Sequence, residues 1–134
     1  MDLDFYICPV CGKLHVAPEG MGTYPCCGQM PQRISLSNGE GAPEKHVPVI
    51  RYMREGCTIE VGEVAHPMQE DHYISNIVLL TEQGYWNNEL SWDEAPTSSF
   101  SLPNGDRVVC AYAYCNKHGL WAGYPDASVN EISM

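Results

Sequence analysis

Apolar and polar residues alternate over several short segments of this chain, which is the pattern of strands. Residues 57–61, Cys-Thr-Ile-Glu-Val, have the period of two that is typical of a half-buried strand. Segments rich in Val, Ile and Tyr predict further strands at 46–52, 73–80 and 107–114. The sequence Pro103-Asn104-Gly105-Asp106 is typical of a hairpin turn that leads into the last of these. No segment has the pattern of a long amphipathic helix, so we expect a mainly β protein with a β-sandwich.

The chain also divides by composition. Closely spaced Cys and Gly residues predict a small metal-binding module at residues 1–36, residues 37–43 have the small and turn-forming residues of a linker, and the strand-like segments fall in a main domain at 44–134. Residues 82–97 fit no element clearly. There Trp86, Leu90 and Trp92 could face a core, whereas the Asn and Asp residues between them favour an exposed loop.

Composition and charge limit the partners. The 134 residues are 44% hydrophobic, which is typical of a globular protein, and the formal net charge is −10. That charge argues against binding to nucleic acid or to an anionic membrane surface. The longest aliphatic run, Ile77-Val78-Leu79-Leu80, is too short to span a bilayer, and the N-terminus lacks the apolar core of a secretory signal. We expect a soluble, cytoplasmic protein.

Seven cysteines in such a protein require an explanation, because in a reducing compartment clustered cysteines are more often metal ligands than disulfides. Cys8 and Cys11 form a CxxC pair, and Cys26 and Cys27 form a second, adjacent pair. Four thiolates from two turns suit a tetrahedral zinc or iron ion, and the spacing does not decide between the two. A disulfide framework is a third alternative. The other cysteines of the strand segments, Cys57 and Cys110, are expected to be buried apolar residues.

A second set of candidate ligands follows the linker. Cys115 and His118 are three residues apart before Gly119, which can adopt a turn conformation that a Cβ disfavours. His46, His66 and His72 lie at the ends of predicted strands and could meet them at one edge of a sandwich. A single histidine at such a position is more often a polar residue satisfied by a hydrogen bond, and His15 is expected to be exposed without a partner. Taken together, however, four histidines and one cysteine exceed the four ligands of a structural zinc site, and they leave one position of an octahedron open for chemistry at iron.

These residues carry a family resemblance. Glu44-Lys45-His46-Val47-Pro48, the segment from Gly62 to Met68, His72-Tyr73-Ile74 and the segment from Tyr114 to Trp121 resemble the signature segments of superoxide reductases. Residues 1–36 are similar to desulforedoxin, and the combination resembles desulfoferrodoxin, the two-iron class of superoxide reductase. The resemblance implies a rubredoxin- or desulforedoxin-like module followed by an immunoglobulin-like β-sandwich, related to neelaredoxin.

The resemblance also implies roles for single residues. Histidines 46, 66, 72 and 118 would be equatorial ligands of a catalytic iron and Cys115 its axial ligand. Lys45 would attract superoxide, Glu44 would fill the open position after oxidation, and the four N-terminal cysteines would hold a second iron, or zinc. The family reduces superoxide to hydrogen peroxide with electrons from a rubredoxin-like donor, and its members usually form homodimers. Two alternatives stay open: a dismutase, which would also release oxygen, and a non-catalytic electron-transfer or zinc-binding module.

Overall fold

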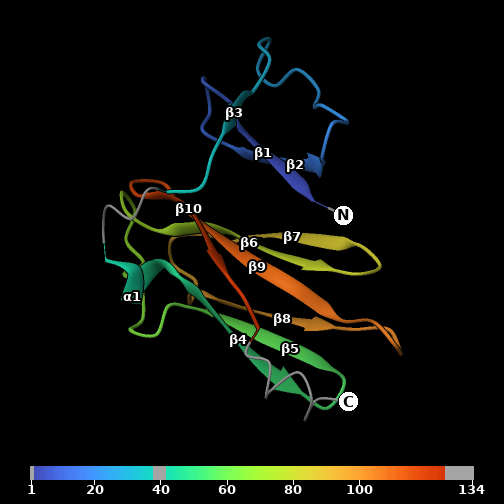
Figure 1. The fold of residues 1–134 in the computed structure, drawn as a ribbon. Helices are drawn as coiled ribbons and strands as arrows, with labels where there is room; N and C mark the ends of the chain where they lie inside the picture. Colours follow the sequence, from blue (N-terminus) through green and yellow to red (C-terminus); the bar gives the residue numbers. More distant parts are fainter. Residues whose placement is uncertain (1, 38–41, 126–134) are drawn as a thin grey trace. The chain divides into compact units, whose positions relative to one another are not determined.

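A computed structural model describes residues 2–37 and 42–125, and these residues form mainly β structure (Figure 1). The chain divides into two compact units between Leu36 and Ser37. Most of the predicted linker (37–43) and the last nine residues of the predicted main domain, 126–134, lie outside the described residues.

The N-terminal unit contains a small antiparallel sheet with the order β2-β1-β3. β1 (Leu3–Ile7) pairs with β2 (Leu14–Pro18) on one side and with β3 (Gln32–Ile34) on the other. Its buried apolar residues include Leu3, Phe5 and Leu14. Since so small a core is weak on its own, polar contacts and a metal centre are expected to contribute much of the stability of this unit.

The second unit is a sandwich of two antiparallel sheets. One sheet has the order β10-β9-β6-β7 and the other the order β4-β5-β8. The strands, seven in the described part of the chain, are β4 (Pro48–Met53), β5 (Gly56–Val61), β6 (Ile74–Thr81), β7 (Tyr85–Glu89), β8 (Thr97–Ser101), β9 (Val108–Cys115) and β10 (Gly119–Gly123). Figure 1 shows the two sheets facing one another. The predicted mainly β fold, with a small N-terminal module followed by a β-sandwich, is therefore confirmed.

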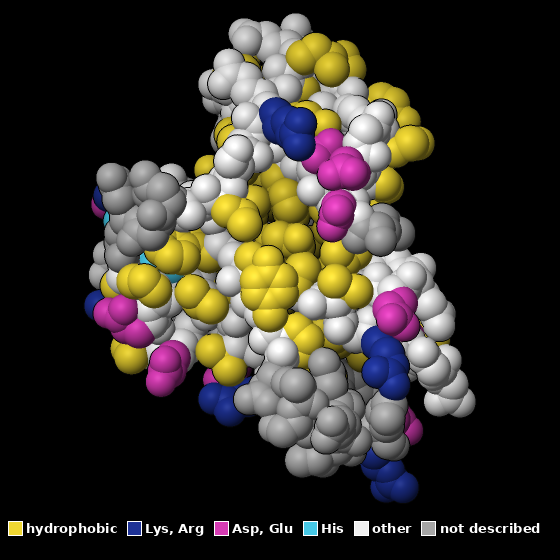
Figure 2. Space-filling view, in the orientation of Figure 1, with side chains coloured by type: hydrophobic (Ala, Val, Ile, Leu, Met, Phe, Trp, Pro, Cys, Tyr) yellow, Lys and Arg dark blue, Asp and Glu magenta, His cyan; other side chains and the backbone are white. Residues whose placement is uncertain are grey.

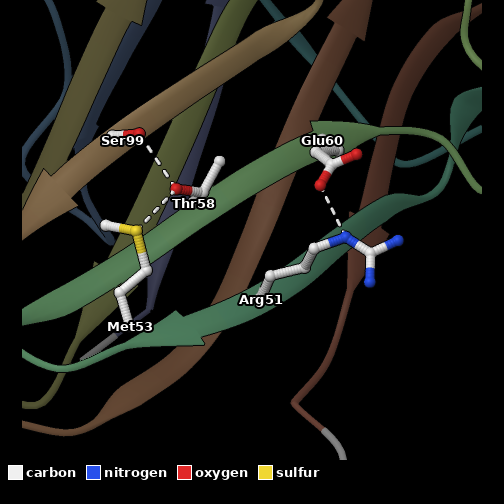
Figure 3. Close-up of polar contacts among 5 residues, drawn as sticks. All are labelled: Arg51, Met53, Thr58, Glu60 and Ser99. Atoms are coloured by element: carbon white, nitrogen blue, oxygen red, sulfur yellow. Dashed lines mark hydrogen bonds and ion pairs between the residues drawn. The ribbon is translucent and has the colours of Figure 1, made fainter.

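The alternation in residues 57–61 positions β5 as predicted. Cys57, Ile59 and Val61 are buried in the core, whereas Thr58 and Glu60 point outward. On the outer face Thr58 lies 2.9 Å from the hydroxyl of Ser99 on β8, and Glu60 pairs with Arg51 on β4 (Figure 3). Apolar residues thus join the sheets, and polar cross-strand pairs cover the solvent side.

The strand predicted at 46–52 begins later than expected. His46 is the last residue of a short helix, α1 (Pro43–His46), and β4 begins at Pro48. Pro43 suits the first turn of a helix because its missing N–H is not needed there. Pro48 forces the preceding residue, Val47, into an extended conformation, so the helix ends at His46.

One further expectation needs correction, and a stretch that was left open can be assigned. The turn at Pro103–Asp106 does form, with the N–H of Asp106 donating to the carbonyl of Pro103 at 3.1 Å. It does not make a hairpin, because β8 and β9 on either side of it belong to different sheets. In the unclear stretch 82–97, β7 is an edge strand: Trp86 packs on the core, and Trp92 is 44% exposed. The polar residues of β7 had favoured a loop, but an edge strand also accommodates them, and Asn87 accepts a hydrogen bond from the side chain of Asn76 at 2.9 Å.

Basic residues do not gather on the face shown in Figure 2. On each unit the described Lys and Arg side chains are interspersed with Asp and Glu. Among the described helices, none has the length and apolar character needed to cross a membrane.

Candidate metal centres

Four cysteines of the N-terminal unit come together from two turns. The turn after β1 carries Cys8 and Cys11, a later turn carries Cys26 and Cys27, and all four sulfur atoms lie within 4.8 Å of one another. Every cysteine is free, and the Sγ atoms of Cys11 and Cys26 are 3.8 Å apart, far beyond the length of an S–S bond at about 2.05 Å. The sulfurs are therefore arranged as separate donors, not as disulfides.

The backbone of these turns points N–H groups at sulfur. The amides of Val10 and Cys11 donate to Sγ of Cys8 at 3.4 and 3.5 Å. Cys27 has a φ of 53° and is followed by Gly28 at 78°. A positive φ is uncommon for a residue with a Cβ, and it fits the strain expected when adjacent residues reach for one site.

The four sulfurs cannot all be thiolates without a cation. Hydrogen bonding by the amide of Cys11 lowers the pKa of Cys8 to about 6. The hydrogen bond with Cys8 and then burial raise the pKa of Cys26 to about 12. A first thiolate thus forms easily and makes the next unfavourable, unless a metal ion offsets the repulsion. This donor set fits a tetrahedral zinc or iron ion.

The second centre is a closed ring of four imidazoles in the sandwich unit. His46 ends α1, His66 and His72 lie in the connection from β5 to β6, and His118 lies in the turn from β9 to β10. Neighbouring ring centroids are 4.7 Å apart for His46 and His66, 4.9 Å for His66 and His72, 5.1 Å for His72 and His118, and 4.8 Å for His118 and His46. Each ring is tilted by 68° to 84° against the next, so the four surround one central axis.

Hydrogen bonds decide which nitrogen of each ring faces the centre. Nδ1 of His46 lies 2.7 Å from the carbonyl of Ala42, and Nδ1 of His66 lies 2.6 Å from the carbonyl of Pro67. Since a carbonyl can only accept, both Nδ1 atoms carry the proton and both Nε2 atoms carry a lone pair. These Nε2 atoms are only 3.2 Å apart, and Nδ1 of His118 lies 3.1 Å from Nε2 of His46.

Lone pairs that converge without a proton between them repel, unless a cation lies among them. Donors about 2.1 Å from one metal ion and at right angles are about 3.0 Å apart, close to the distances observed. Nε2 of His72 is likewise buried without a hydrogen-bond partner among the described residues. The side chains therefore fit a bound metal ion.

The sulfur of Cys115 completes this group. Cys115 ends β9 and is fully buried, and its Sγ lies 3.9 Å from Nδ1 of His118. The donor atoms of His46, His66, His72 and Cys115 all lie within 4.8 Å of one another. His118 is not a member of that closest set, but its ring neighbours three of its members. The structure thus brings all five side chains together, while their roles as ligands stay a prediction.

Burial keeps the imidazoles in the form that binds metals. It lowers the pKa of His66 to about 4, and it also lowers the pKa values of His46 and His72. These rings are neutral near pH 7. Burial raises the pKa of Cys115, against the opposing effect of the Lys117 and His118 amides, so a nearby cation is needed for a stable thiolate.

The turn that carries His118 has the backbone predicted for it. Gly119 has a φ of 84° and pairs with Cys115 across a three-residue hairpin loop. Two positions after Gly119, the indole N–H of Trp121 donates to the carbonyl of His118 at 3.0 Å, and the indole stacks on His46 with ring centroids 4.9 Å apart. Sequence reasoning included Trp121 in a motif but gave it no role. Its position three residues after His118 was the signal in the sequence that could have indicated this contact.

Glu44 and Lys45 are exposed on α1, directly before His46. The connection that follows β5 packs against this helix at Gly62. A Cβ on Gly62 would lie 2.8 Å from the carbonyl oxygen of Glu44 and 2.8 Å from the carbonyl carbon of Lys45. Only glycine fits at this contact, and the contact holds the helix that carries the two charged candidates. It joins segments that are distant in the sequence, so no local pattern reveals it.

The remaining candidates lie elsewhere. Cys57 and Cys110 are buried in strands, as predicted. His15 is not exposed as expected. It is half-buried on β2, and its Nε2 has no hydrogen-bond partner among the described residues. A polar residue on a short strand was expected to face solvent, but residues of a small sheet are covered by structure that the local pattern does not reveal.

Comparison with known proteins agrees with these two centres. The family model described as Desulfoferrodoxin matches residues 38–124, which include the sandwich strands and all five side chains of the second centre. A desulfoferrodoxin of Syntrophotalea carbinolica is 38% identical over 121 residues, 90% of this chain and 94% of the relative. A desulfoferrodoxin of Desulfarculus baarsii is 42% identical over 120 residues, 89% of this chain and 94% of that one.

A solved structure shares the fold. The superoxide reductase from Treponema pallidum superposes with a TM-score of 0.77 at 34% identity, and the match covers 91% of this chain and 97% of that one. The family match spans more than half of the chain, and the relatives match it over nearly their full length. With a four-cysteine cluster in its first unit and a ring of imidazoles around a buried thiol in its second, the chain belongs to the desulfoferrodoxin family.

Proposed function

We propose that this protein is a superoxide reductase, which reduces superoxide to hydrogen peroxide at a mononuclear non-haem iron without releasing oxygen. The carrying observation is that the unprotonated Nε2 atoms of His46 and His66 lie 3.2 Å apart, with Nδ1 of His118 and the buried sulfur of Cys115 beside them. Family membership supports the same activity, since relatives are named desulfoferrodoxin and a similar solved structure is a superoxide reductase. We assign His46, His66, His72, His118 and Cys115 as the ligands.

When bound, iron supplies the single electron by which superoxide, with two protons, becomes hydrogen peroxide, the metal passing from ferrous to ferric. The chain's own residues prepare this site. The carbonyls of Ala42 and Pro67 hold the protons of His46 and His66 on Nδ1 and so keep Nε2 free to coordinate. Burial keeps the rings of His46 and His66 neutral; it also raises the pKa of Cys115, which hydrogen bonds from the Lys117 and His118 amides partly offset.

Lys45 is proposed to attract the substrate. Superoxide is an anion and the protein has a formal net charge of −10, so the overall field repels it. Lys45 is exposed and directly precedes His46, which supports a position of its positive charge close to the centre. Lys117, a weaker candidate, is 51% exposed and has Asp71 at 3.9 Å, a carboxylate that offsets part of its charge. Glu44 is proposed to close the open position once the site is oxidised.

The rest of the chain is assigned in the same proposal. Residues 1–36 form a desulforedoxin-like module whose Cys8, Cys11, Cys26 and Cys27 hold a second iron, or zinc; residues 37–43 form the linker and residues 44–134 the catalytic domain. A rubredoxin-like protein supplies the electrons, and the protein works as a cytoplasmic homodimer. Free cysteines throughout the chain suit a reducing compartment.

Stopped-flow mixing of the ferrous protein with superoxide tests the function. We expect one ferrous centre to be oxidised per superoxide, peroxide as product, and no oxygen beyond that of the uncatalysed reaction. Oxygen released in step with peroxide would instead identify a dismutase. A protein that binds zinc at both centres and does not react would be a non-catalytic module.

A further inference from the structure

The ring of His72 lacks the carbonyl contact that the rings of His46 and His66 have. The rings of His46 and His66 are fixed by carbonyls at 2.7 and 2.6 Å, whereas among the described residues the ring of His72 has no comparable carbonyl contact. Its position must therefore come from the backbone around it. That backbone is a tight turn in which Gln69 and His72 exchange hydrogen bonds of 2.9 and 3.1 Å.

A side chain from the other ligand segment holds this turn. Oδ1 of Asn116 accepts the backbone N–H of Tyr73 at 2.9 Å, and its Nδ2 donates to the carbonyl of Asp71 at 3.0 Å. The backbone N–H of Asn116 also donates to the carbonyl of Tyr73 at 3.2 Å. Asn116 thus bonds the backbone on both sides of His72, forty-four positions away along the chain.

Asn116 itself lies between two other candidate ligands, Cys115 and His118. The hydrogen bonds between Asn116 and the turn of His72 therefore also fix the distance between His72 and the hairpin that carries Cys115. We propose that Asn116 is a positioning residue: its amide sets the place of His72 relative to Cys115 and His118, and so sets how well the centre holds its metal ion. This inference rests on the ligand assignment of the proposed function.

The chemistry of the amide makes the proposal specific. Only a side chain with an acceptor and a donor on the same group can bond an N–H and a carbonyl at once. Aspartate keeps the acceptor for Tyr73 but places a second oxygen against the carbonyl of Asp71. Alanine loses both contacts.

The test compares Asn116→Ala and Asn116→Asp with the parent in the full chain loaded with zinc. NMR would measure hydrogen exchange of the Tyr73 amide, and the rate at which a chelator takes up zinc would measure release of the metal. We expect faster exchange at Tyr73 in Asn116→Ala and parent-like protection in Asn116→Asp. Release of one of the two metal ions should be about 10- to 100-fold faster in Asn116→Ala than in the parent, because residues that orient metal ligands have effects of this size. In Asn116→Asp the rate of release should lie between those of Asn116→Ala and the parent. The exposed Asn104, in the turn before β9, provides the control Asn104→Ala, which should change neither quantity.

In the iron-loaded protein, Asn116→Ala should also alter the ferric electron paramagnetic resonance spectrum, because the ligand field changes when His72 moves. Parent-like metal release and a parent-like spectrum in Asn116→Ala would overturn the proposal. Exchange of the Tyr73 amide that is as fast in Asn116→Asp as in Asn116→Ala would also overturn it. None of these measurements uses superoxide. A parent protein that fails to reduce superoxide would therefore contradict the proposed function alone.

Discussion

At the scale of single residues, the second centre depends on which nitrogen of each histidine keeps its proton. The sequence shows that histidines are present at positions 46 and 66 but not that the carbonyls of Ala42 and Pro67 hold their Nδ1 protons. Those contacts require the backbone of α1 and of the His66-Pro67 segment. Residue types could therefore be read from the sequence, whereas the directions of their lone pairs could not.

The charge of Lys45 leads to a kinetic prediction. Lys45→Ala should slow the second-order reaction with superoxide by about ten- to a hundredfold, because the local positive field is lost in an acidic protein. The ferric absorption spectrum should stay unchanged, since no ligand is removed. Pulse radiolysis measures the rate. Arg54→Ala, which removes an equal charge from the exposed turn between β4 and β5, is the matched control and should react like the parent. An unchanged rate in Lys45→Ala would remove this lysine from the mechanism.

Glu44 is expected to act on the oxidised protein. Glu44→Ala should alter the ferric absorption spectrum more than it alters the rate of the reaction with superoxide, because the carboxylate is assigned to the ferric state alone. Absorption spectra of the oxidised protein and pulse radiolysis of the reduced protein provide the comparison. Glu63→Ala, which removes another exposed carboxylate, is its control. A large loss of rate with a parent-like spectrum would contradict the assignment.

At the scale of elements, strands were easier to predict than the contacts between their connections. Cys57, Ile59 and Val61 alternate with polar residues, and β5 followed directly from that pattern. α1 was missed because a helix of four residues has too few positions to show a period. The contact of Gly62 with α1 joins residues that lie far apart in the sequence, and only the packed structure reveals it.

Gly62 therefore offers a test of how the second centre is built. Gly62→Ala should lower the free energy of unfolding by about 1–3 kcal/mol, the usual cost of forcing a methyl group into a packed site. The added Cβ would lie 2.8 Å from the backbone of Glu44, so α1 must move. Gly84→Ala is the matched control, since a Cβ there meets nothing within 4 Å. Urea unfolding of both variants measures the difference, and equal stability would show that the connection yields without cost.

At the scale of the whole molecule, the composition indicated two metal centres and an acidic surface without showing how the centres are built. Clustered cysteines predicted the first centre, and the structure groups the same four sulfurs. The second centre draws donors from α1, the β5–β6 connection and the β9–β10 turn. The fold brings them together. Positions at the ends of predicted strands indicated the members of this centre, and the family resemblance added the role of each.

Burial of these histidines predicts how stability depends on pH. In the metal-free fold the pKa of His66 is lowered to about 4 from the ordinary 6.5. Between these pH values the unfolded chain binds more protons than the folded chain. The stability of the metal-free protein should therefore be fully present above about pH 6.5 and should fall as the pH drops to about 4. Urea unfolding at several pH values measures this slope. His66→Gln should have a shallower slope over the same range, and an equal slope would exclude His66 as its source.

The most direct test of the account is a crystal structure of the iron-loaded protein with the iron located by its anomalous scattering. We predict one iron bonded to Nε2 of His46, His66 and His72, to Nδ1 of His118 and to Sγ of Cys115, with one coordination position not filled by these side chains. An iron bonded through the other nitrogen of His46 or His66, or with any of the five donors beyond bonding distance, would contradict the account.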